Sequence, residues 1–497
     1  MTMPARRLGP WVLAAGLPGM HLPGMHLPGL RLPDYDRAGV SVGIVHLGLG
    51  NFHRAHQAVY TDEVLAADPG WGIAGVSLRA PDTRDALAPQ DGLFTVVQRG
   101  EGEPSHRIVG SVVRLLVAPE DPACVVGLLA APATRIVTLT ITEKGYCRNA
   151  AGTGLDPRHP DILADLAAPE RPRTMPGLLV AALARRHALG LPPFAVLSCD
   201  NLPANGTVAR AVLLEFARLA APGIVDWLAR DLATPCTMVD RIVPATTEAD
   251  RAELTARLGY ADAWPVVTEP FSQWVIEDRF PLGRPAWERA GAIFARDVAP
   301  FETMKLRLLN GSHSTLAYLG LLLGLDTVAE AMAHAPLRRF VTDLARLELA
   351  PTLTLPVGQD GDAYLASLHR RFANPSVRHA LAQIAADGSQ KLPQRLLAAA
   401  HERLAAGAGV ARIATVIAGW IACWRRAAAG DARFRLADPL ADALRQAASD
   451  PHPAREFLRL AGQAGTITGT SAFCALVDAG LADIEANGVQ VLLRPAP

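Results

Sequence analysis

The sequence predicts an α/β fold followed by a second, mainly helical part. Three observations support this prediction. A β-branched run in VSVGIVHLGLG reaches a glycine turn at Gly48 and continues as a helical pattern. Predominantly apolar strands recur at 135–142 and 194–200, which suits a sheet covered on both faces. From about residue 297 onward, Ala, Leu and Arg dominate in helical segments such as ARIATVIAGWIACWRRAAAG.

The chain of 497 residues is too long for one hydrophobic core, so we divide it into three parts. Residues 1–29 are expected to be a disordered extension, because the near-repeat PGMHLPGMHLPGLRLP is rich in proline and glycine. Met20 or Met25 could serve as a later start. Residues 30–296 are the predicted α/β domain, and residues 297–497 are the helical domain.

Composition narrows the classes of partner. Basic and acidic residues number 48 each, and no block of one sign stands out, which disfavours nucleic acid and anionic membranes. The six cysteines show neither a CxxC pair nor a disulfide or zinc spacing, which favours a cytoplasmic location. No apolar run is long enough to span a bilayer.

The segment around Gly48 has the order strand, glycine turn, helix that a dinucleotide site requires. Glycines let the backbone turn tightly and approach a pyrophosphate, which sits at the helix N-terminus. The third glycine of a GxGxxG pattern is absent, because His53 occupies its position. The pattern predicts a Rossmann-like domain, although glycine-rich strand ends are common in other folds.

Polar residues stand at the ends of the predicted strands, where ligands of parallel sheets bind. Asp82 follows the strand WGIAGVSLR, and an acid there can bind ribose hydroxyls and repel a 2′-phosphate, which favours NAD over NADP. Arg79 weakens this argument, because an arginine can receive that phosphate. Thr142-Glu143, Asn201 and Asp240 occupy similar positions, and a local cap is the alternative interpretation for each.

The segment KLRLLNGSHSTLAYLG, residues 305–320, is predicted to be helical with ionisable residues on an apolar face. At about 100° per residue, the side chains of Glu302, Lys305, Asn310 and His313 fall within an arc of roughly 140°. Two interpretations remain open from this pattern alone. The polar groups could form a satisfied helix rim, or they could be a lysine base, an amide donor and a histidine that face one pocket.

Metal and nucleophile sites are disfavoured. Among His46, His53 and His56 only the last two could share a helical face, and no acid or cysteine completes a zinc set. The sequence has no HExxH, GxSxG or P-loop motif. Cys199 is expected to pack as a small apolar residue rather than to act as a nucleophile.

Several blocks together resemble the polyol-specific long-chain dehydrogenases, the mannitol dehydrogenase family. They are GIVHLGLGNFHRAHQAVYTDEVL, LTITEKGYC, LSCDNLPANG, MVDRIVP, WPVVTEPFSQWVIEDRF and ETMKLRLLNGSHSTLAYLG, which span roughly residues 40 to 320. Weaker similarity, including DGSQKLPQ, reaches the C-terminus. The resemblance implies a monomeric, zinc-independent enzyme that interconverts D-mannitol and D-fructose with NAD.

The resemblance also implies roles for individual residues. Lys305 matches the general base, and Asn201 and Asn310 match the amides that polarise the reacting oxygen. His313 matches a ligand of substrate hydroxyls. The remaining matches are Asp240 and Lys391 near the substrate, Glu302 on a proton path, and Gly48, Leu49, Gly50, Asn51, Phe52, Asp82, Thr142 and Glu143 around the cofactor.

This chemistry agrees with the residues themselves. Oxidation of an alcohol needs a proton taken from oxygen while hydride leaves carbon, and burial can lower the pKa of a lysine toward the working pH. Two amides can stabilise the developing alkoxide, and one such donor is typically worth a few kcal/mol. Lysine and amides then share the task that a metal performs elsewhere.

Three alternatives stay open. Fructuronate or tagaturonate reduction would need an additional cation for the substrate carboxylate, and Lys391 is the one clear candidate. Gln383 stands where the resemblance leads us to expect an arginine, so arabinitol or sorbitol could replace mannitol. A non-catalytic helical binding protein would bind no nicotinamide and would tolerate the loss of Lys305.

Overall fold

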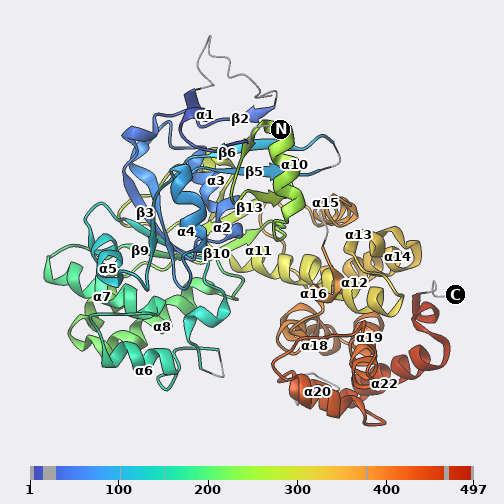
Figure 1. Cartoon of the computed structure of the whole chain (residues 1–497). Coiled ribbons are helices and arrows are strands. Elements are labelled where there is room, and N and C mark those ends of the chain that lie inside the picture. Colours follow the sequence, from blue (N-terminus) through green and yellow to red (C-terminus); the bar gives the residue numbers. More distant parts are fainter. Residues whose placement is uncertain are drawn as a thin grey trace. The chain divides into compact units, whose positions relative to one another are not determined.

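The computed structural model describes residues 5–14, 29–100, 102–149, 152–376, 379–463 and 470–493. The chain divides into two compact units, Met1–Val298 and Ala299–Pro497. Each unit is described by itself (Figure 1). The first is built on a parallel sheet and the second on helices, so the predicted combination of an α/β domain and a mainly helical domain is confirmed.

The central sheet of the first unit has five parallel strands in the order β7-β4-β3-β8-β9. Their bounds are β3 Val42–Leu47, β4 Gly72–Ser77, β7 Val112–Val117, β8 Ile136–Leu139 and β9 Ala195–Ser198. The apolar strands expected at 135–142 and 194–200 are therefore present as β8 and β9. Strand order reverses between β3 and β8, which is the position where open α/β sheets bind ligands.

Alternating side chains of β3 explain how both faces of the sheet are covered. Val45 and Leu47 pack into a core with helices α5, α7 and α8, whereas Ile44 packs into a second core on the opposite face. Because successive strand side chains point to opposite faces, a run of apolar residues buries both. The helices of the first unit are α1 Trp11–Ala14, α2 Asn51–Ala55, α3 Gln57–Asp62, α4 Asp82–Leu87, α5 Pro122–Ala130, α6 Pro160–Ala167, α7 Met175–Ala188, α8 Asn205–Ala220, α9 Val225–Asp231 and α10 Glu248–Leu258.

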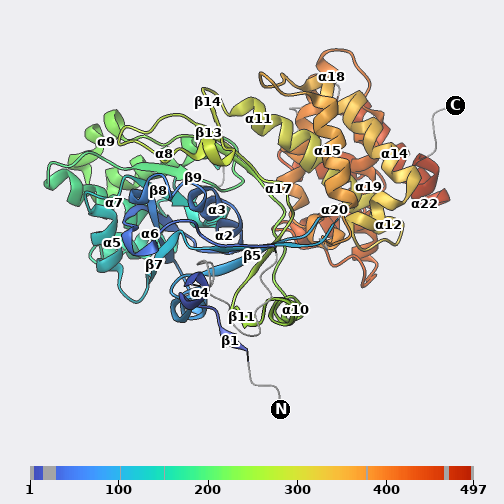
Figure 2. The same ribbon diagram turned by 90° about the horizontal axis from the view of Figure 1, so that it is seen from above.

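Two smaller sheets extend the first unit beyond the core Rossmann topology. One has the order β12-β5-β6-β2 and the other the order β10-β13-β14. The bounds are β2 Leu30–Arg31, β5 Phe94–Gln98, β6 Ser105–Val109, β10 Thr237–Asp240, β12 Val266–Thr268, β13 Gln273–Glu277 and β14 Ile293–Ala295. Figure 2 shows β13 and β14 side by side, as their parallel pairing requires.

The expected disorder of residues 1–29 is corrected for residues 5–14. Strand β1 (Arg6–Arg7) pairs in parallel with β11 (Tyr260–Ala261), and Leu8 and Val12 are buried in an apolar cluster with residues of β5 and α10. The residues before the Pro/Gly repeat thus pair and pack with residues more than 200 positions later in the chain. Local composition could not reveal this long-range contact. Residues 15–28, which include most of the near-repeat, lie outside the described residues.

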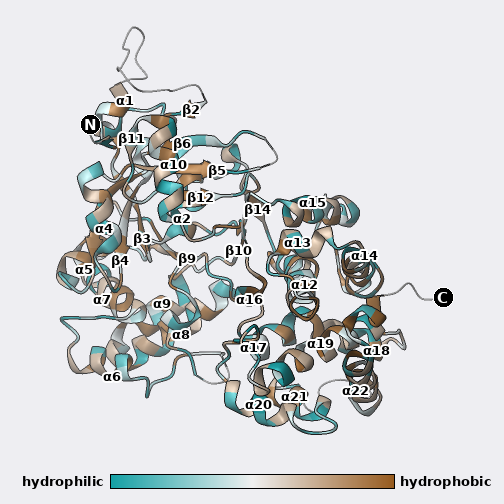
Figure 3. Cartoon of the chain, turned by 45° about the vertical axis from the view of Figure 1, so that its right-hand side comes forward, coloured by the Kyte–Doolittle hydropathy of each residue, from teal (hydrophilic) through white to brown (hydrophobic). Residues whose placement is uncertain are grey.

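The second unit is a helical assembly around α12 (Gly311–Leu322) and α19 (Ala411–Ala428), which pack against each other. Figure 3 shows brown, hydrophobic residues in α19, and its Trp420 and Trp424 are fully buried. The other helices are α11 Ala299–Met304, α13 Val328–Ala333, α14 Ala335–Leu344, α15 Gly361–Ala373, α16 Leu381–Ile384, α17 Gly388–Leu392, α18 Ala398–Ala405, α20 Ala441–Ala448, α21 Ala454–Leu460 and α22 Thr470–Asn487.

Among the described residues of this unit, three short segments are π-helical rather than α-helical. They are Lys305–Asn310, Ala345–Leu349 and Pro393–Leu397. The first interrupts the predicted regular helix after α11, so the expected 100° spacing does not hold there. π-Helical turns are rare and occur frequently at functional sites.

Candidate functional site

The glycine turn after β3 has the backbone that a dinucleotide site requires. Gly48 has φ +96°, and a Cβ built there would lie 2.1 Å from the Thr140 carbonyl oxygen. Gly50 precedes α2 with ordinary φ, and a Cβ there would meet nothing closer than the Gly48 carbonyl oxygen at 3.8 Å. Gly48 is therefore required by the fold, whereas Gly50 leaves open space in front of a helix N-terminus.

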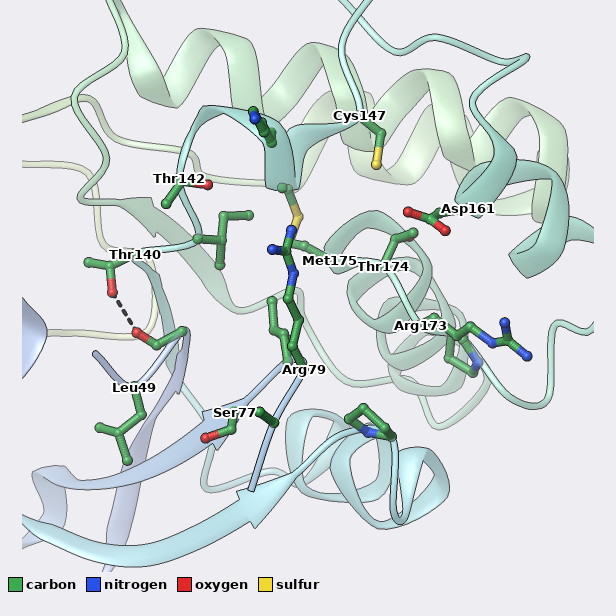
Figure 4. Close-up of a pocket in the computed structure, with 18 of the residues that line it drawn as sticks. Leu49, Ser77, Arg79, Thr140, Thr142, Cys147, Asp161, Arg173, Thr174 and Met175 are labelled. Atoms are coloured by element: carbon green, nitrogen blue, oxygen red, sulfur yellow. Dashed lines mark hydrogen bonds between the residues drawn. The ribbon is translucent and has the colours of Figure 1, made fainter. Parts of the chain in front are cut away.

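A cavity of about 720 Å³ opens beside this turn (Figure 4). Its wall combines the ends of β3, β4 and β8 with the start of α7. It is lined by Gly48, Leu49, Gly50, Ser77, Leu78, Arg79, Ala80, Pro119, Pro122, Thr140, Ile141, Thr142, Lys144, Gly145, Cys147, Asp161, Arg171, Pro172, Arg173, Thr174 and Met175. The cavity therefore lies at the carboxyl ends of the strands, at the reversal of strand order between β3 and β8.

Thr142 lines the cavity in a backbone conformation unusual for a residue with a Cβ, at φ +64°. The half-buried Asp200 carboxylate holds this turn by accepting hydrogen bonds from the backbone N–H groups of Ile141 (3.2 Å) and Thr142 (2.9 Å), and from the Tyr146 hydroxyl (2.8 Å). Burial raises the pKa of Asp200 to about 6. Asp200 is therefore a local cap that fixes the cavity wall.

Several predicted cofactor contacts do not line this cavity. Asp82 is exposed in the first turn of α4, while Arg79 lines the wall instead. Asn51 and Phe52 begin α2, where the Asn51 Oδ1 accepts a hydrogen bond from Arg54 (2.7 Å). Glu143 opens the turn that brings its neighbour Lys144 to the wall.

The wall on the α7 side was not predicted from the sequence. Asp165 accepts hydrogen bonds from the backbone N–H groups of Arg173 (2.8 Å) and Thr174 (3.0 Å), and Thr174 caps α7. This network places Arg173 and Met175 beside the cavity. The segment follows α6 rather than a strand, so a search of strand ends could not find it.

His46 and His53 pack against each other in the first unit. His53 replaces the third glycine of the pattern, and its ring stacks on that of His46 at 3.4 Å between centroids. His46 contacts the Thr138 hydroxyl at 2.8 Å and the Thr140 hydroxyl at 2.9 Å. Burial lowers the pKa of His46 to about 3 and that of His53 well below its usual value, so both rings are neutral at pH 7. Within the described part of the chain, no group of three potential ligands could hold a metal ion.

Asn201 and Asp240 lie at the ends of β9 and β10. Asn201 is exposed after the strand, and Asp240 is the buried last residue of β10. Asn205 joins the two segments, because its amide donates to the carbonyl oxygens of Ser198 (3.1 Å) and Thr237 (3.0 Å). Asn205 was not singled out from the sequence, although it follows Asn201 by four residues.

In the second unit, the π-helical segment carries the predicted base and amide. The N–H of Gly311 bonds to the carbonyl of Leu306, five residues earlier. In a turn with hydrogen bonds from residue i to i+5, residues five apart lie close together. Lys305 and Asn310 therefore lie closer to the same helix face than they would in a regular α-helix. The Lys305 side chain is buried, with 7% of the residue exposed, and Asn310 is half-buried.

His313 is buried one turn beyond, and its ring packs against Phe372 at 4.3 Å and His379 at 5.1 Å between centroids. Burial, reinforced by His379, Arg395, Arg371 and Lys305, lowers its pKa well below the usual value. Among the described residues, its Nε2 finds no hydrogen-bond partner. A buried nitrogen of this kind normally has a partner, and a ligand hydroxyl would supply one.

Three further residues of this unit were considered from the sequence: Glu302, Lys391 and Gln383. Glu302 is half-buried in α11. The Lys391 ammonium donates to the Ala386 carbonyl (2.7 Å) and lies 3.8 Å from the Asp387 carboxylate. Gln383 is exposed in α16. The roles proposed for these side chains stay predictions.

Two arginines near His313 were not predicted. Arg395 belongs to the π-helical segment Pro393–Leu397 and donates to the Ser314 hydroxyl (3.1 Å), and Arg371 also interacts electrostatically with His313. The backbone of Pro393–Leu397 lies close to Gly311, because a Cβ built on Gly311 would lie 3.2 Å from the Arg395 carbonyl oxygen. Since 58 or more residues separate these arginines from His313, only the tertiary fold reveals them.

Comparison with known proteins identifies the family. The family model described as Mannitol dehydrogenase Rossmann domain matches residues 42–289, and that described as Mannitol dehydrogenase C-terminal domain matches residues 297–468. The chain belongs to the mannitol dehydrogenase family, as its motifs predicted.

Relatives within the family carry different names. Mannitol 2-dehydrogenase of Pyrenophora tritici-repentis is 42% identical over 424 residues, which cover 84% of this chain and 75% of the relative. D-mannonate oxidoreductase of Escherichia coli is 45% identical over 393 residues, which cover 78% and 81% of the two chains. The solved structure of Pseudomonas fluorescens mannitol 2-dehydrogenase, a ternary complex with NAD and D-mannitol, matches with a TM-score of 0.87, 37% identity and 98% coverage of each chain.

Proposed function

We propose that this chain is an NAD-dependent polyol dehydrogenase that interconverts D-mannitol and D-fructose. The observation that carries the proposal is the buried pair Lys305 and His313, with a His313 nitrogen left for a ligand. The named activity of the fungal relative and the ligands of the bacterial ternary complex agree with it.

The first unit fits the cofactor. Gly48 makes the turn, and the open space in front of Gly50 allows the pyrophosphate to approach the N-terminus of α2. When bound, NAD accepts the hydride that leaves the carbinol carbon. The neighbouring cavity of about 720 Å³ is within the range of small-molecule and cofactor sites.

The second unit supplies the acid–base chemistry. During mannitol oxidation, the Lys305 Nζ takes the proton of the reacting hydroxyl while hydride leaves the same carbon. During fructose reduction, the same nitrogen returns the proton. Asn310, together with Asn201 of the first unit, is proposed to donate to the oxygen on which charge develops, and His313 to bind a neighbouring hydroxyl. Glu302 is proposed to pass the proton to solvent, and Asp240 and Lys391 to contact the substrate.

No step of this proposal uses zinc. The negative charge on the reacting oxygen is stabilised by the Lys305 ammonium and the two amides, which replaces a Lewis acid. A chelator should therefore leave turnover unchanged. Loss of activity in EDTA that zinc restores would contradict this part of the proposal.

A hexuronate ketose is a second candidate substrate, because Arg371 and Arg395 lie near His313. A substrate carboxylate would be attracted by these guanidinium groups, and arginine is well suited to bind carboxylates. One relative, 45% identical, is named D-mannonate oxidoreductase. Mannonate is a sugar carboxylate, so this likeness also favours a carboxylate substrate. The sequence by itself indicates only Lys391 as a cation for the substrate carboxylate.

A substrate panel separates the two candidates. NADH oxidation would be followed with D-fructose, D-xylulose, D-fructuronate and D-tagaturonate. Turnover with fructose supports the mannitol assignment, and turnover confined to uronates moves the substrate while retaining the chemistry. NADH binding without turnover of any ketose would reject the proposed reaction.

We further propose a monomer that works in the cytoplasm. All six cysteines are free thiols, which fits a reducing compartment. No helix of the described residues has the length and apolar character needed to cross a membrane. Light scattering after size-exclusion chromatography would test the monomer directly, and a mass of twice 52.6 kDa would contradict it.

A further inference from the structure

The cavity of the first unit has an excess of positive charge that NAD alone does not explain. Its lining includes Arg79, Lys144, Arg171 and Arg173, against one carboxylate, Asp161. The pyrophosphate of a dinucleotide already has a helix N-terminus beside Gly50. The surplus of cations therefore suits a ligand with an additional phosphate group.

Arg79 is the cation placed at the end of the second strand, β4. Figure 4 shows its side chain rising from the strand end across the middle of the cavity toward Met175. The guanidinium makes no hydrogen bond or ion pair with the described residues, and it is exposed. It is therefore available to a ligand without breaking an existing interaction.

The acids near Arg79 do not oppose a phosphate there. Asp82, the predicted ribose contact, is exposed on α4 and does not line the cavity. Arg84 binds two further carboxylates, those of Asp85 (2.5 Å) and Glu120 (2.8 Å). In Rossmann folds this strand end contacts the adenosine ribose, where an acid favours NAD and an arginine accommodates a 2′-phosphate.

We infer that the chain accepts NADP(H) as well as NAD(H), and that Arg79 binds the 2′-phosphate. This inference rests on the proposed dehydrogenase function and adds a second cofactor to it. Guanidinium–phosphate pairs are strong because they are charge-assisted and can be bidentate. Removal of Arg79 should thus weaken binding of the phosphorylated cofactor selectively.

The test measures binding rather than turnover. NADH and NADPH would be titrated by nucleotide fluorescence into the full chain, with adenosine 2′,5′-bisphosphate and adenosine 5′-monophosphate as competitors. We expect wild type to bind NADPH, and Arg79→Gln to weaken NADPH and the bisphosphate by about tenfold or more. NADH and the monophosphate should change by less than about threefold. Arg84→Gln is the matched control, because it removes a guanidinium outside the cavity.

Two outcomes would overturn the inference. In the first, wild type does not bind NADPH at concentrations at which NADH saturates it. In the second, Arg79→Gln weakens the binding of NADH and NADPH equally, which would show that Arg79 contacts a group common to both cofactors. These outcomes differ from a failure of the proposed function. If NADPH binds through Arg79 and no ketose is reduced, the inference stands and the proposed reaction fails.

Discussion

His313 combines burial, a neutral ring and a nitrogen without a partner in the described structure. If that nitrogen binds a substrate hydroxyl, His313→Leu should raise KM for D-fructose by about tenfold or more and change the Kd of NADH little. Steady-state kinetics and NADH titration would measure the two effects. His369→Gln is the control. The His369 ring contacts the Thr342 hydroxyl rather than the proposed substrate site, so its replacement should leave KM unchanged. An unaltered KM in His313→Leu would remove His313 from the substrate site.

Protonation of buried histidines should limit stability in acid. The pKa of His46 is lowered to about 3, and those of His53 and His313 are well below 6.5. The unfolded chain therefore binds more protons below pH 6.5, so stability falls as pH falls through that value. Asp200, with its pKa raised to about 6, and Asp62, whose pKa burial also raises, act in the opposite direction, but these two carboxyls do not offset the three imidazoles.

We therefore expect the Tm to drop between pH 7 and pH 5. His53→Phe keeps a ring for stacking on His46 and removes one of the titrating groups, so its Tm should depend less on pH. Differential scanning calorimetry at the two pH values gives both numbers. A variant with the wild-type pH dependence would show that His53 is not held neutral by burial.

At this scale the sequence indicates only part of the site. Lys305, Asn310 and His313 can be proposed from the sequence because they share one short segment. Arg79 was noted, but nothing in its local pattern showed that it rather than Asp82 would line the cavity. Arg371 and Arg395 could not be found, since their proximity to His313 depends on contacts between distant helices. One compositional signal was available: the chain has only three lysines among 48 basic residues, namely Lys144, Lys305 and Lys391.

At the scale of elements, the turn between β3 and α2 separates a folding requirement from a binding requirement. Gly48→Ala would place a Cβ 2.1 Å from a carbonyl oxygen at positive φ, so it should lower the Tm strongly. Gly50→Ala meets no atom closer than 3.8 Å, so the Tm should stay near wild type. Its methyl group would still obstruct the pyrophosphate, and the Kd of NADH should rise about tenfold or more.

Thermal unfolding and NADH titration of both variants test this separation. Equal NADH affinity in Gly50→Ala and wild type would show that the pyrophosphate does not approach this turn. The strands around the turn were predictable because each is a short apolar run. The π-helical segment Lys305–Asn310 was not, because its residues fit an α-helix equally well and the wider turn depends on tertiary contacts such as those with Pro393–Leu397.

At the scale of the whole molecule, residues 5–14 are part of the first unit rather than a loose extension. Leu8 and Val12 are 1% and 0% exposed, and burial of such side chains is worth about 1.5–3 kcal/mol each. Deletion of residues 2–14 should therefore lower the Tm by about 5 °C or more. Calorimetry of the shortened chain measures this. An unchanged Tm would show that the pairing of β1 with β11 contributes nothing to stability.

The two-domain architecture and the family could be predicted because local periodicity and several dense motifs agree over most of the chain. The additional sheets β12-β5-β6-β2 and β10-β13-β14 were not predicted as sheets, because their strands are short and pair across long sequence separations. The N-terminal segment was misjudged for the same reason.

The central claim is that Lys305 is the general base of an NAD-dependent polyol dehydrogenase. The most direct measurement is fructose-dependent oxidation of NADH by wild type and Lys305→Ala, with the Kd of NADH determined for both. We predict turnover in wild type, a loss of about 10² to 10⁴-fold in kcat for the variant, and an unchanged Kd. Lys305→Arg should fail similarly, because arginine keeps the charge but does not release its proton. Full turnover by Lys305→Ala with NADH bound would contradict the account.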